Sequence, residues 1–347
     1  DDAMRIMHLV IISLMMFPTL LLADPLPLDK LHLPPGFHIE IYAKVPEARQ
    51  MALGKNQIVF LGTRGDKVFP VLPQIQAGQR PIVTVADKLY MPNGVAILND
   101  DLYVAEVNRI LRFPHISQQL TKPKPPQTIA RLPDKAHHGL RFIAFGPDQK
   151  LYVGIGMPCN VCLPEEPIFG TIIRMDKDGK QMEIFARGIR NTVGFDWDPL
   201  TKKLWFSENG ADFFGDNIPP DKINYAPEAG LDYGFPYIHG ANFPDPVHGK
   251  KAANKSFTPP TYNLQAHVAA LGIAFYTGQS FPKGYQQQLF VAEHGSWNRK
   301  KKVGYQVILA KLTSDRTGIA SSEPFVTGWL QNETAWGRPV DVLSMPD

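Results

Sequence analysis

The stretch HHGLRFIAFGPDQKLYVGIG, residues 137–156, has the pattern of a β-hairpin that follows two adjacent histidines. Apolar residues alternate with others on both sides of Gly146-Pro147-Asp148, as they do in half-buried strands. Turn residues between two such runs are typical of a hairpin. Since a single hairpin cannot bury its own apolar face, this one requires neighbours.

The same layout recurs along the chain. The phrases DDLYVAE, QKLYVGI, KKLWFSE and QQLFVAE are almost interchangeable, and each forms the second strand of such a unit. The units cover residues 49–71, 91–113, 137–156, 190–211, 268–297 and 337–347. Repeats of this size stack radially, so the sequence predicts an all-β, six-bladed β-propeller. The sixth unit stops where its first turn should begin, so we expect an incomplete last blade at the C-terminus, unless residues 36–45 supply a strand that closes the ring.

Composition and termini restrict the class of protein. The net charge of +3 is dispersed, and the one basic run, residues 299–302, indicates a solvated loop tip instead of a nucleic-acid surface. Residues 1–23 combine a tag remnant, DDAM, with a signal peptide whose apolar part, residues 9–23, is shorter than the roughly 20 residues of a membrane span. We therefore expect one propeller domain over residues 24–347, secreted or periplasmic, without stable membrane insertion.

Two cysteines lie close together in the sequence PCNVC. In an exported protein, Cys159 and Cys162 fit a short-loop disulfide. Free thiols and a redox or metal role remain alternatives, although no further metal ligands lie nearby and no histidine follows the pair as a haem attachment requires.

In a propeller, the first strand of each unit is innermost, and the residues before it converge on one mouth of the central channel. Most of the residues at these positions are polar or charged: Arg49-Gln50, Asn93-Gly94, His137-His138, Arg190-Asn191, His267 and Arg338. Such convergence predicts a binding site. His138 is the natural base, and Arg190 and Arg338 are cations suited to carboxylates, which indicates a pocket for a polyanion beside a base.

An acidic, glycine-containing segment, residues 207–237, follows the fourth unit. Its carboxylates and carbonyls suit a hard cation such as Ca²⁺, although it lacks the spacing of an EF-hand loop. An acidic surface loop explains the same residues equally well.

Over residues 33–347 the chain resembles the glucose/sorbosone dehydrogenase family, above all its sorbosone-dehydrogenase-like branch. The resemblance is carried by LPPGFHIEIYAKVPEARQMALG, HHGLRFIAFGPDQKLYVGIG, PCNVC, RNTVGFDWDP, LWFSENGAD, GDNIPPDKIN, LDYGFPY, EHGSWNR and GRPVDV. It implies a quinoprotein that uses pyrroloquinoline quinone (PQQ) and Ca²⁺ on a six-bladed propeller.

The resemblance also implies roles for individual residues. His138 matches the catalytic base, and Arg190 matches the arginine beside the reducible carbonyls of the cofactor. Gly210 and Ala211 match the two main-chain carbonyls that bind Ca²⁺. The remaining positions matched to the cofactor are Asn93, Asn191, Arg338, and Asn298 or Arg299 in place of the family's lysine. A second arginine of the family is replaced by Val340.

The implied reaction is oxidation of a sugar or a sugar-derived aldehyde. His138 takes a proton from a substrate hydroxyl, hydride passes to the quinone, and an external acceptor collects the electrons. Two other classes are carried as alternatives: a calcium-dependent propeller lactonase or other hydrolase, which needs acidic side chains around its metal, and a non-catalytic binding propeller.

Overall fold

The computed structural model describes residues 25–347, so the predicted tag remnant and signal peptide lie outside the described residues. Strands dominate this part of the chain. Its helices are short 3₁₀ turns: η1 (Leu28–Lys30), η2 (Lys55–Gln57), η3 (Ile116–Gln118) and η4 (Gly249–Ala252). Within residues 25–347, no helix has the length and apolar character needed to span a bilayer.

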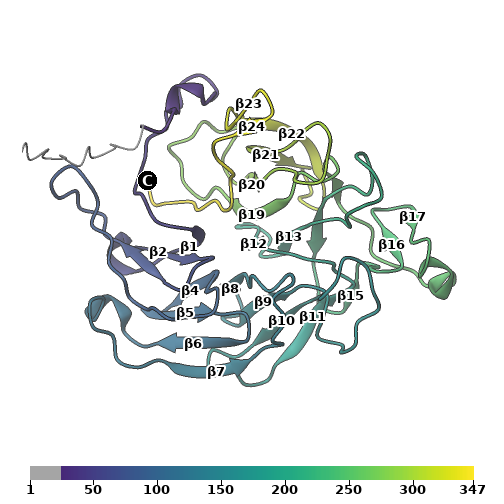
Figure 1. The fold of residues 1–347 in the computed structure, drawn as a ribbon, viewed down its shortest axis with the longest axis horizontal. Coiled ribbons are helices and arrows are strands. Elements are labelled where there is room, and N and C mark those ends of the chain that lie inside the picture. The colour runs from purple at the N-terminus through teal and green to yellow at the C-terminus, as the bar shows by residue number, and fades with distance from the viewer. Residues whose placement is uncertain (1–24) are drawn as a thin grey trace, which may run out of the picture.

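Five sheets of three or more strands surround a central axis (Figure 1). The first contains β1 (Ala48–Leu53), β2 (Val59–Thr63) and β3 (Phe69–Val71), and the second β4 (Gly94–Leu98), β5 (Asp101–Ala105), β6 (Arg109–Phe113) and β7 (Gln127–Arg131). The third contains β8 (Ile143–Phe145), β9 (Leu151–Ile155), β10 (Thr171–Met175), β11 (Glu183–Arg187) and the parallel β15 (Leu231–Asp232). The fourth contains β12 (Phe195–Trp197), β13 (Leu204–Glu208), β14 (Lys222–Ala226) and β18 (Tyr262–Asn263), and the fifth β19 (Ala270–Phe275), β20 (Leu289–Glu293), β21 (Gln306–Leu312) and β22 (Ile319–Val326). Two small hairpins complete the strands: β16 (Ile238–His239) with β17 (Phe243–Pro244), and β23 (Leu330–Gln331) with β24 (Thr334–Ala335).

The repeated sequence phrase marks the second strand of each sheet. All residues of β2, β5, β9, β13 and β20 are buried. Each pair of neighbouring sheets encloses its own apolar cluster, for example Phe60 against Val104 and Trp205 against Val291. The predicted radial stacking of hairpins is therefore confirmed, and the first strands β1, β4, β8, β12 and β19 lie at the inner edges of their sheets (Figure 1).

The prediction of six blades is wrong, because the described residues form five. Residues 337–347 lie at the sixth position without forming a strand. They contact both neighbours mostly through side chains. The Gly272 N–H donates to the Val340 carbonyl at 2.9 Å, but the Met51 N–H donates to Asp341 Oδ2 at 2.8 Å and the Thr277 N–H to Ser344 Oγ at 3.1 Å. Bonds to side chains of this kind do not make a backbone ladder.

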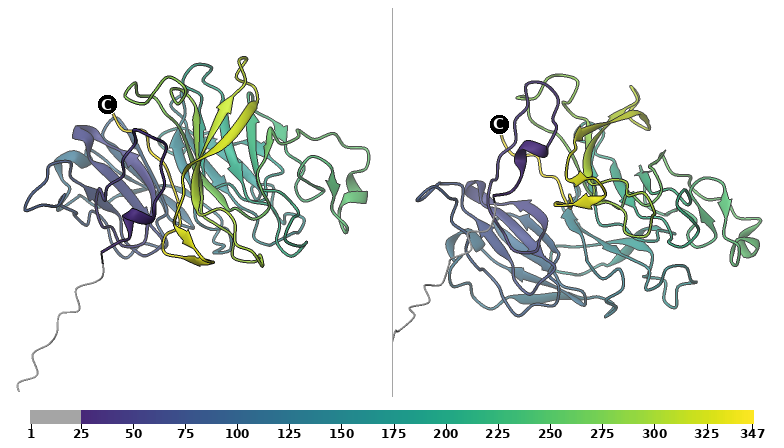
Figure 2. Two further views of the ribbon diagram at one scale, coloured as in Figure 1. Left: turned by 90° about the horizontal axis from the view of Figure 1, so that it is seen from above. Right: turned by 45° about the horizontal axis from the view of Figure 1, so that its top comes forward.

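Two extended segments fill the sixth position by packing their side chains. The segment near the N-terminus runs beside the C-terminal segment in Figure 2, and His32 forms an isolated bridge with Thr327. Ile39 packs with Val342 against the fifth sheet, while Val45 packs with Met345 against the first. Residues 36–45 thus occupy the gap at the sixth position. They do not form the ring-closing strand that the sequence analysis considered for them.

Asp341 should make the stability of the ring depend on pH. Burial raises the pKa of this carboxyl to about 7, although the N–H groups of Met51 and Val342 oppose the shift. The folded protein therefore holds a proton that the unfolded chain releases near pH 4. The stabilising contribution is complete below about pH 4 and is lost as the pH rises through 7.

The measurement is the free energy of unfolding between pH 4 and pH 8, for the wild type and for Asp341→Asn. The wild type should lose stability relative to the variant as the pH rises. Asp347→Asn is the matched control, because the N–H of Gln279 lowers the pKa of Asp347 and places its titration below this range. Parallel curves for wild type and Asp341→Asn would contradict the assignment.

Candidate functional site

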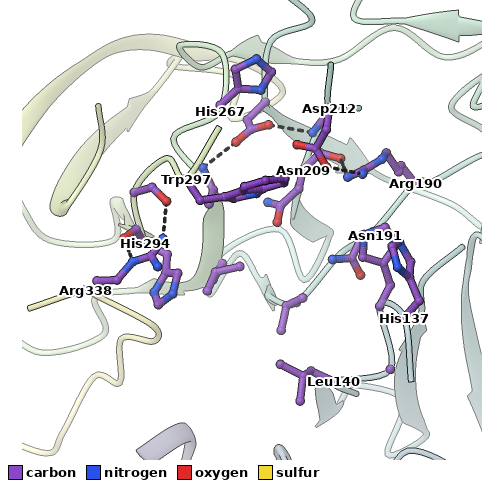
Figure 3. Close-up of a pocket in the computed structure, with 18 of the residues that line it drawn as sticks. His137, Leu140, Arg190, Asn191, Asn209, Asp212, His267, His294, Trp297 and Arg338 are labelled. Atoms are coloured by element: carbon purple, nitrogen blue, oxygen red, sulfur yellow. Dashed lines mark hydrogen bonds and ion pairs between the residues drawn. The ribbon is translucent and has the colours of Figure 1, made fainter. Parts of the chain in front are cut away.

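A cavity of about 640 Å³ opens where first strands begin and second strands end. Loops of all five sheets and the segment at the sixth position contribute to its wall (Figure 3). Its polar and aromatic lining residues are Arg49, Arg64, His137, His138, Arg190, Asn191, Asn209, Asp212, Asp221, His267, His294, Trp297, Asn298 and Arg338.

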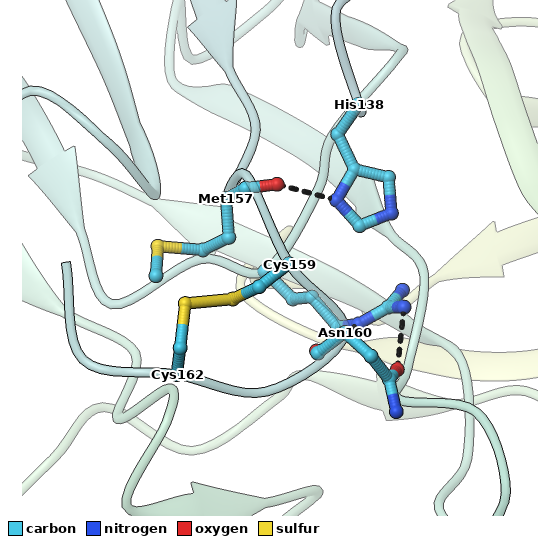
Figure 4. Close-up of a disulfide and its surroundings, with 6 residues drawn as sticks. His138, Met157, Cys159, Asn160 and Cys162 are labelled. Carbon is cyan, nitrogen blue, oxygen red and sulfur yellow. Dashed lines mark hydrogen bonds between the residues drawn. A yellow bond between two sulfur atoms is a disulfide. The ribbon is translucent and has the colours of Figure 1, made fainter. Parts of the chain in front are cut away.

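His138 is held as a neutral base with a defined tautomer. Its Nδ1 lies 2.7 Å from the Met157 carbonyl oxygen (Figure 4). A carbonyl only accepts, so Nδ1 carries the proton and Nε2 keeps its lone pair. Burial lowers the pKa of His138 to about 3, assisted by the positive charge of Arg190 and by His137. The close packing requires Gly156, since a Cβ there would lie 2.5 Å from the Cβ of His138.

Arg190 is buried, and protein acceptors hold its guanidinium on several sides. Nε donates to the Asn160 carbonyl and Nη2 to Asn160 Oδ1, each at 2.9 Å. Nη2 also pairs with Asp212 Oδ2 at 3.1 Å, and the main-chain N–H donates to Glu208. Burial lowers the pKa of Arg190, and Asp212 opposes that shift. The guanidinium is thereby fixed beside His138.

Three further arginines concentrate positive charge on the wall. Within residues 25–347, Arg49, Arg64 and Arg338 make no ion pair with a carboxylate. Arg338 donates to the carbonyls of His294 at 3.1 Å and Gly295 at 2.6 Å. Burial, together with the positive charges of Arg64 and Arg338, lowers the pKa of Arg49 to about 10, although the Asp341 carboxyl opposes the shift. The mutual repulsion would be relieved by an anionic ligand.

The two carboxylates of the lining are already engaged by the protein. Asp212 accepts from Arg190 and, at 2.9 Å, from Asn298 Nδ2. Asp221 is buried and accepts the N–H groups of Gly210 and Ala269, each at 2.7 Å. Burial raises the pKa of Asp221 to about 6.

An aromatic pair stands at the rim of the cavity. The side chain of Trp297 is drawn across the middle of the pocket in Figure 3. Trp297 is 65% exposed and Phe213 is 76% exposed, and their rings meet edge to face with centroids 5.8 Å apart. This leaves apolar aromatic surface facing solvent where a ligand would enter.

Comparison with known proteins agrees with this geometry. The family model described as Glucose / Sorbosone dehydrogenase matches residues 117–296. An uncharacterised protein of Borreliella burgdorferi is 34% identical over 332 residues, which cover 91% of this chain and 86% of that protein. The chain belongs to the glucose/sorbosone dehydrogenase family.

Solved structures show the same fold at low sequence identity. The PQQ domain of pyranose dehydrogenase from Coprinopsis cinerea superimposes with a TM-score of 0.73 and 17% identity, covering 90% of this chain and 91% of that one. The PQQ-bound aldose sugar dehydrogenase from Streptomyces coelicolor gives a TM-score of 0.64 and 20% identity, covering 90% and 87%.

The structure of this glucose/sorbosone dehydrogenase relative brings most of the residues predicted for the site to one cavity. His138, Arg190, Asn191, Asn298, Arg338 and Gly210 line it. Three predicted residues lie elsewhere. Asn93 is buried behind the wall, where Nδ2 donates to the Arg141 carbonyl at 2.6 Å and Oδ1 accepts from Arg49 at 3.1 Å. Asn93 therefore orients an arginine of the lining.

The other two departures are Arg299 and Ala211. Arg299 turns away to the carbonyls of Asp216 and Ala266, so of the two candidates for the family's lysine position only Asn298 lines the cavity. Ala211 is fully buried and does not line the cavity. In the part of the chain that the structure describes, no three His, Cys, Asp or Glu side chains are grouped as a metal site.

Sequence reasoning missed several residues of the family member's pocket. Arg64 follows β2, Asp212 lies just beyond β13, and His294 and Trp297 follow β20. In an antiparallel hairpin, the end of the second strand lies beside the start of the first. The residues that follow each repeated phrase could therefore have been predicted, from the sequence, to line the same cavity.

His138 should stay neutral throughout the ordinary working range of pH. Nuclear magnetic resonance of the imidazole nitrogens is expected to show a protonated Nδ1 and an unprotonated Nε2 from about pH 4 to pH 8, given the pKa of about 3. Arg190→Ala removes a neighbouring positive charge and should raise the pKa. A titration midpoint near 6.5 in the wild type would show that the ring is solvated.

Proposed function

We propose that the protein is a PQQ- and Ca²⁺-dependent oxidoreductase that oxidises a sugar or a sugar-derived aldehyde. The observation that carries the proposal is a cavity with a neutral histidine base and three arginines that make no ion pair with a carboxylate of residues 25–347. Family membership and the fold shared with PQQ-binding sugar dehydrogenases support it.

The residues present fit the cofactor. PQQ carries three carboxylates, and Arg49, Arg64 and Arg338 supply three cations at the cavity wall. The amide side chains of Asn191 and Asn209 add donors and acceptors beside them. An uncharged ligand would not offset the repulsion among these cations, which together with burial lowers the pKa of Arg49. When bound, the quinone supplies the two-electron acceptor for the oxidation.

The chain's own residues perform the acid–base part of the reaction. His138 Nε2 accepts the proton of a substrate hydroxyl, while the Met157 carbonyl keeps Nδ1 protonated and the ring oriented. Arg190, held by Asn160 and Asp212, presents a fixed positive charge where negative charge develops. Its donors need no rearrangement, because the protein already holds the guanidinium in place.

A bound Ca²⁺ would be coordinated by main-chain carbonyl oxygens and not by carboxylates. Asp212 and Asp221 are occupied by N–H donors of the protein. The carbonyl of Gly210 is the candidate that lines the cavity. The same feature weighs against a calcium-dependent lactonase, whose metal requires acidic side chains that are available to it.

A carbohydrate suits the aromatic rim. Exposed aromatic surface is costly in water, and the indole of Trp297 offers a flat apolar face to the C–H face of a sugar ring. Phe213 supports that indole edge to face.

We also propose that the protein is exported from the cytoplasm. The apolar residues 9–23 have the features of a signal peptide. The Cys159–Cys162 disulfide, confirmed in the structure, suits an oxidising compartment such as the periplasm. An external partner collects the electrons.

Titration of the purified protein with PQQ, with and without Ca²⁺, tests the proposal by the change in cofactor absorbance. We expect saturable binding that requires Ca²⁺, and dye-linked oxidation of aldoses or aldehydes by the loaded protein. Arg338→Ala should weaken cofactor binding by about tenfold or more, since it removes a charge-assisted partner. A wild type that neither binds PQQ nor reduces the dye would leave a non-catalytic binding propeller.

His138→Ala should lower kcat by a factor of about 10² to 10⁴ while the affinity for PQQ stays within about threefold. A base acts as the proton leaves, so its loss appears in turnover more than in binding. His137→Ala is the control, because His137 is exposed and lacks the Met157 contact. An inactive His137→Ala beside an active His138→Ala would show that His137, and not His138, is the base.

A further inference from the structure

The disulfide loop lies directly beside the catalytic histidine. Met157, whose carbonyl orients His138, precedes Cys159 by two residues (Figure 4). Cys159, Val161 and Cys162 pack against the apolar cluster between the second and third sheets. The loop is thus anchored on its apolar side, and Asn160 points the other way, toward Arg190.

Asn160 uses both the oxygen and the nitrogen of its side-chain amide within this network. Its Oδ1 accepts from Arg190 Nη2 at 2.9 Å and from the Asp212 N–H at 2.8 Å. Its Nδ2 donates to the Asp212 carbonyl at 3.0 Å, and its own carbonyl accepts from Arg190 Nε at 2.9 Å. An alanine at this position would lose both the acceptor and the donor of this side chain.

The network ties together loops from three sheets. Asn160 follows β9 of the third sheet, Asp212 follows β13 of the fourth, and Asn298 follows β20 of the fifth and donates to Asp212 Oδ1 at 2.9 Å. Arg190 lies at the centre of these contacts and also pairs with Asp212. Moving Asn160 would therefore remove two of the contacts that hold the guanidinium and two of those that hold the loop that carries Phe213.

We propose that Asn160 is a positioning residue for Arg190 and that the Cys159–Cys162 disulfide keeps Asn160 in place for this task. This inference rests on the proposed function, because it gives the disulfide a role in the catalytic site. The cysteines are three residues apart, and so small a closed loop restricts the unfolded chain little. The cross-link instead constrains the long connection between β9 (ending at Ile155) and β10 (beginning at Thr171).

The activity test compares Asn160→Ala with the double variant Cys159→Ser/Cys162→Ser. Each should lower kcat about 10- to 100-fold with sugar KM within about threefold, as expected when a catalytic group is misplaced by a fraction of an ångström to an ångström. Thermal midpoints should fall by no more than about 4 °C. The triple variant should lose no more than Asn160→Ala alone, because the disulfide acts through Asn160.

Asn108→Ala is the matched control, since Asn108 is an asparagine of another loop whose side chain makes, within residues 25–347, one long hydrogen bond, to Asp134 at 3.5 Å. It should keep wild-type turnover. The proposal would be overturned if the fold-loss of kcat in the triple variant equalled the product of the losses in the two separate variants. A wild-type kcat for Asn160→Ala would also overturn it.

A second measurement needs neither cofactor nor turnover. The amide of Asp212 donates to Asn160 Oδ1, so its hydrogen exchange in the cofactor-free protein should accelerate about tenfold or more in both variants but not in Asn108→Ala. Unchanged exchange would sink the positioning role, even if Asn160→Ala were inactive. Accelerated exchange in a protein that fails to bind PQQ would preserve the positioning role and reject the proposed function.

Discussion

Burial of the second strand on both faces is the constraint on which the structure depends. β2, β5, β9, β13 and β20 have no residue exposed to solvent. Each sheet therefore needs an apolar neighbour on either side, and radial stacking provides one. Polar side chains near the inner edges of the sheets are satisfied from other sheets: Gln50 of the first sheet accepts the N–H groups of Val95 in the second and Ile143 in the third, and Asp196 of the fourth accepts that of Phe275 in the fifth. The apolar clusters hold the sheets together, and these hydrogen bonds fix their relative positions.

The same stacking creates the site. Because the inner strands begin at one end of the ring, side chains that are distant in sequence meet there without any loop having to reach far. The protein then tolerates unfavourable features at that end: several arginines close together, a desolvated histidine and two exposed aromatic rings. Such features cost stability and are kept where a ligand compensates for them. The sheets below supply the rigidity, so the cavity can carry residues chosen for chemistry.

Much of the fold could be predicted from the sequence, because hairpin periodicity and the repeated phrase are local signals. The way in which the sixth position is filled could not be predicted. Residues 337–347 resemble a first strand in sequence, but they do not form one in the structure, and they pack by their side chains with residues 36–45. For the site, the starts of first strands led to His138, Arg190, Asn191 and Arg338. Asn93 and Arg299 were placed too near the cavity, since position along the chain does not reveal which way a side chain turns. The arrangement of Asn160 with Arg190 and Asp212 depends on contacts between loops of different sheets, which a single sequence does not encode visibly.

The closure of the ring has a consequence for how the molecule assembles. The Met51 N–H and Asp341 are 290 residues apart in sequence, whereas the connections within the hairpins are far shorter. The entropy lost on joining distant segments grows with the length of the chain between them, so the hairpins and their nearest seams form first. The seam between the first and fifth sheets is then the last to be sealed. Until that moment the inner faces of both sheets are open to water, and a newly made chain is most exposed to misassembly with other chains along this one seam.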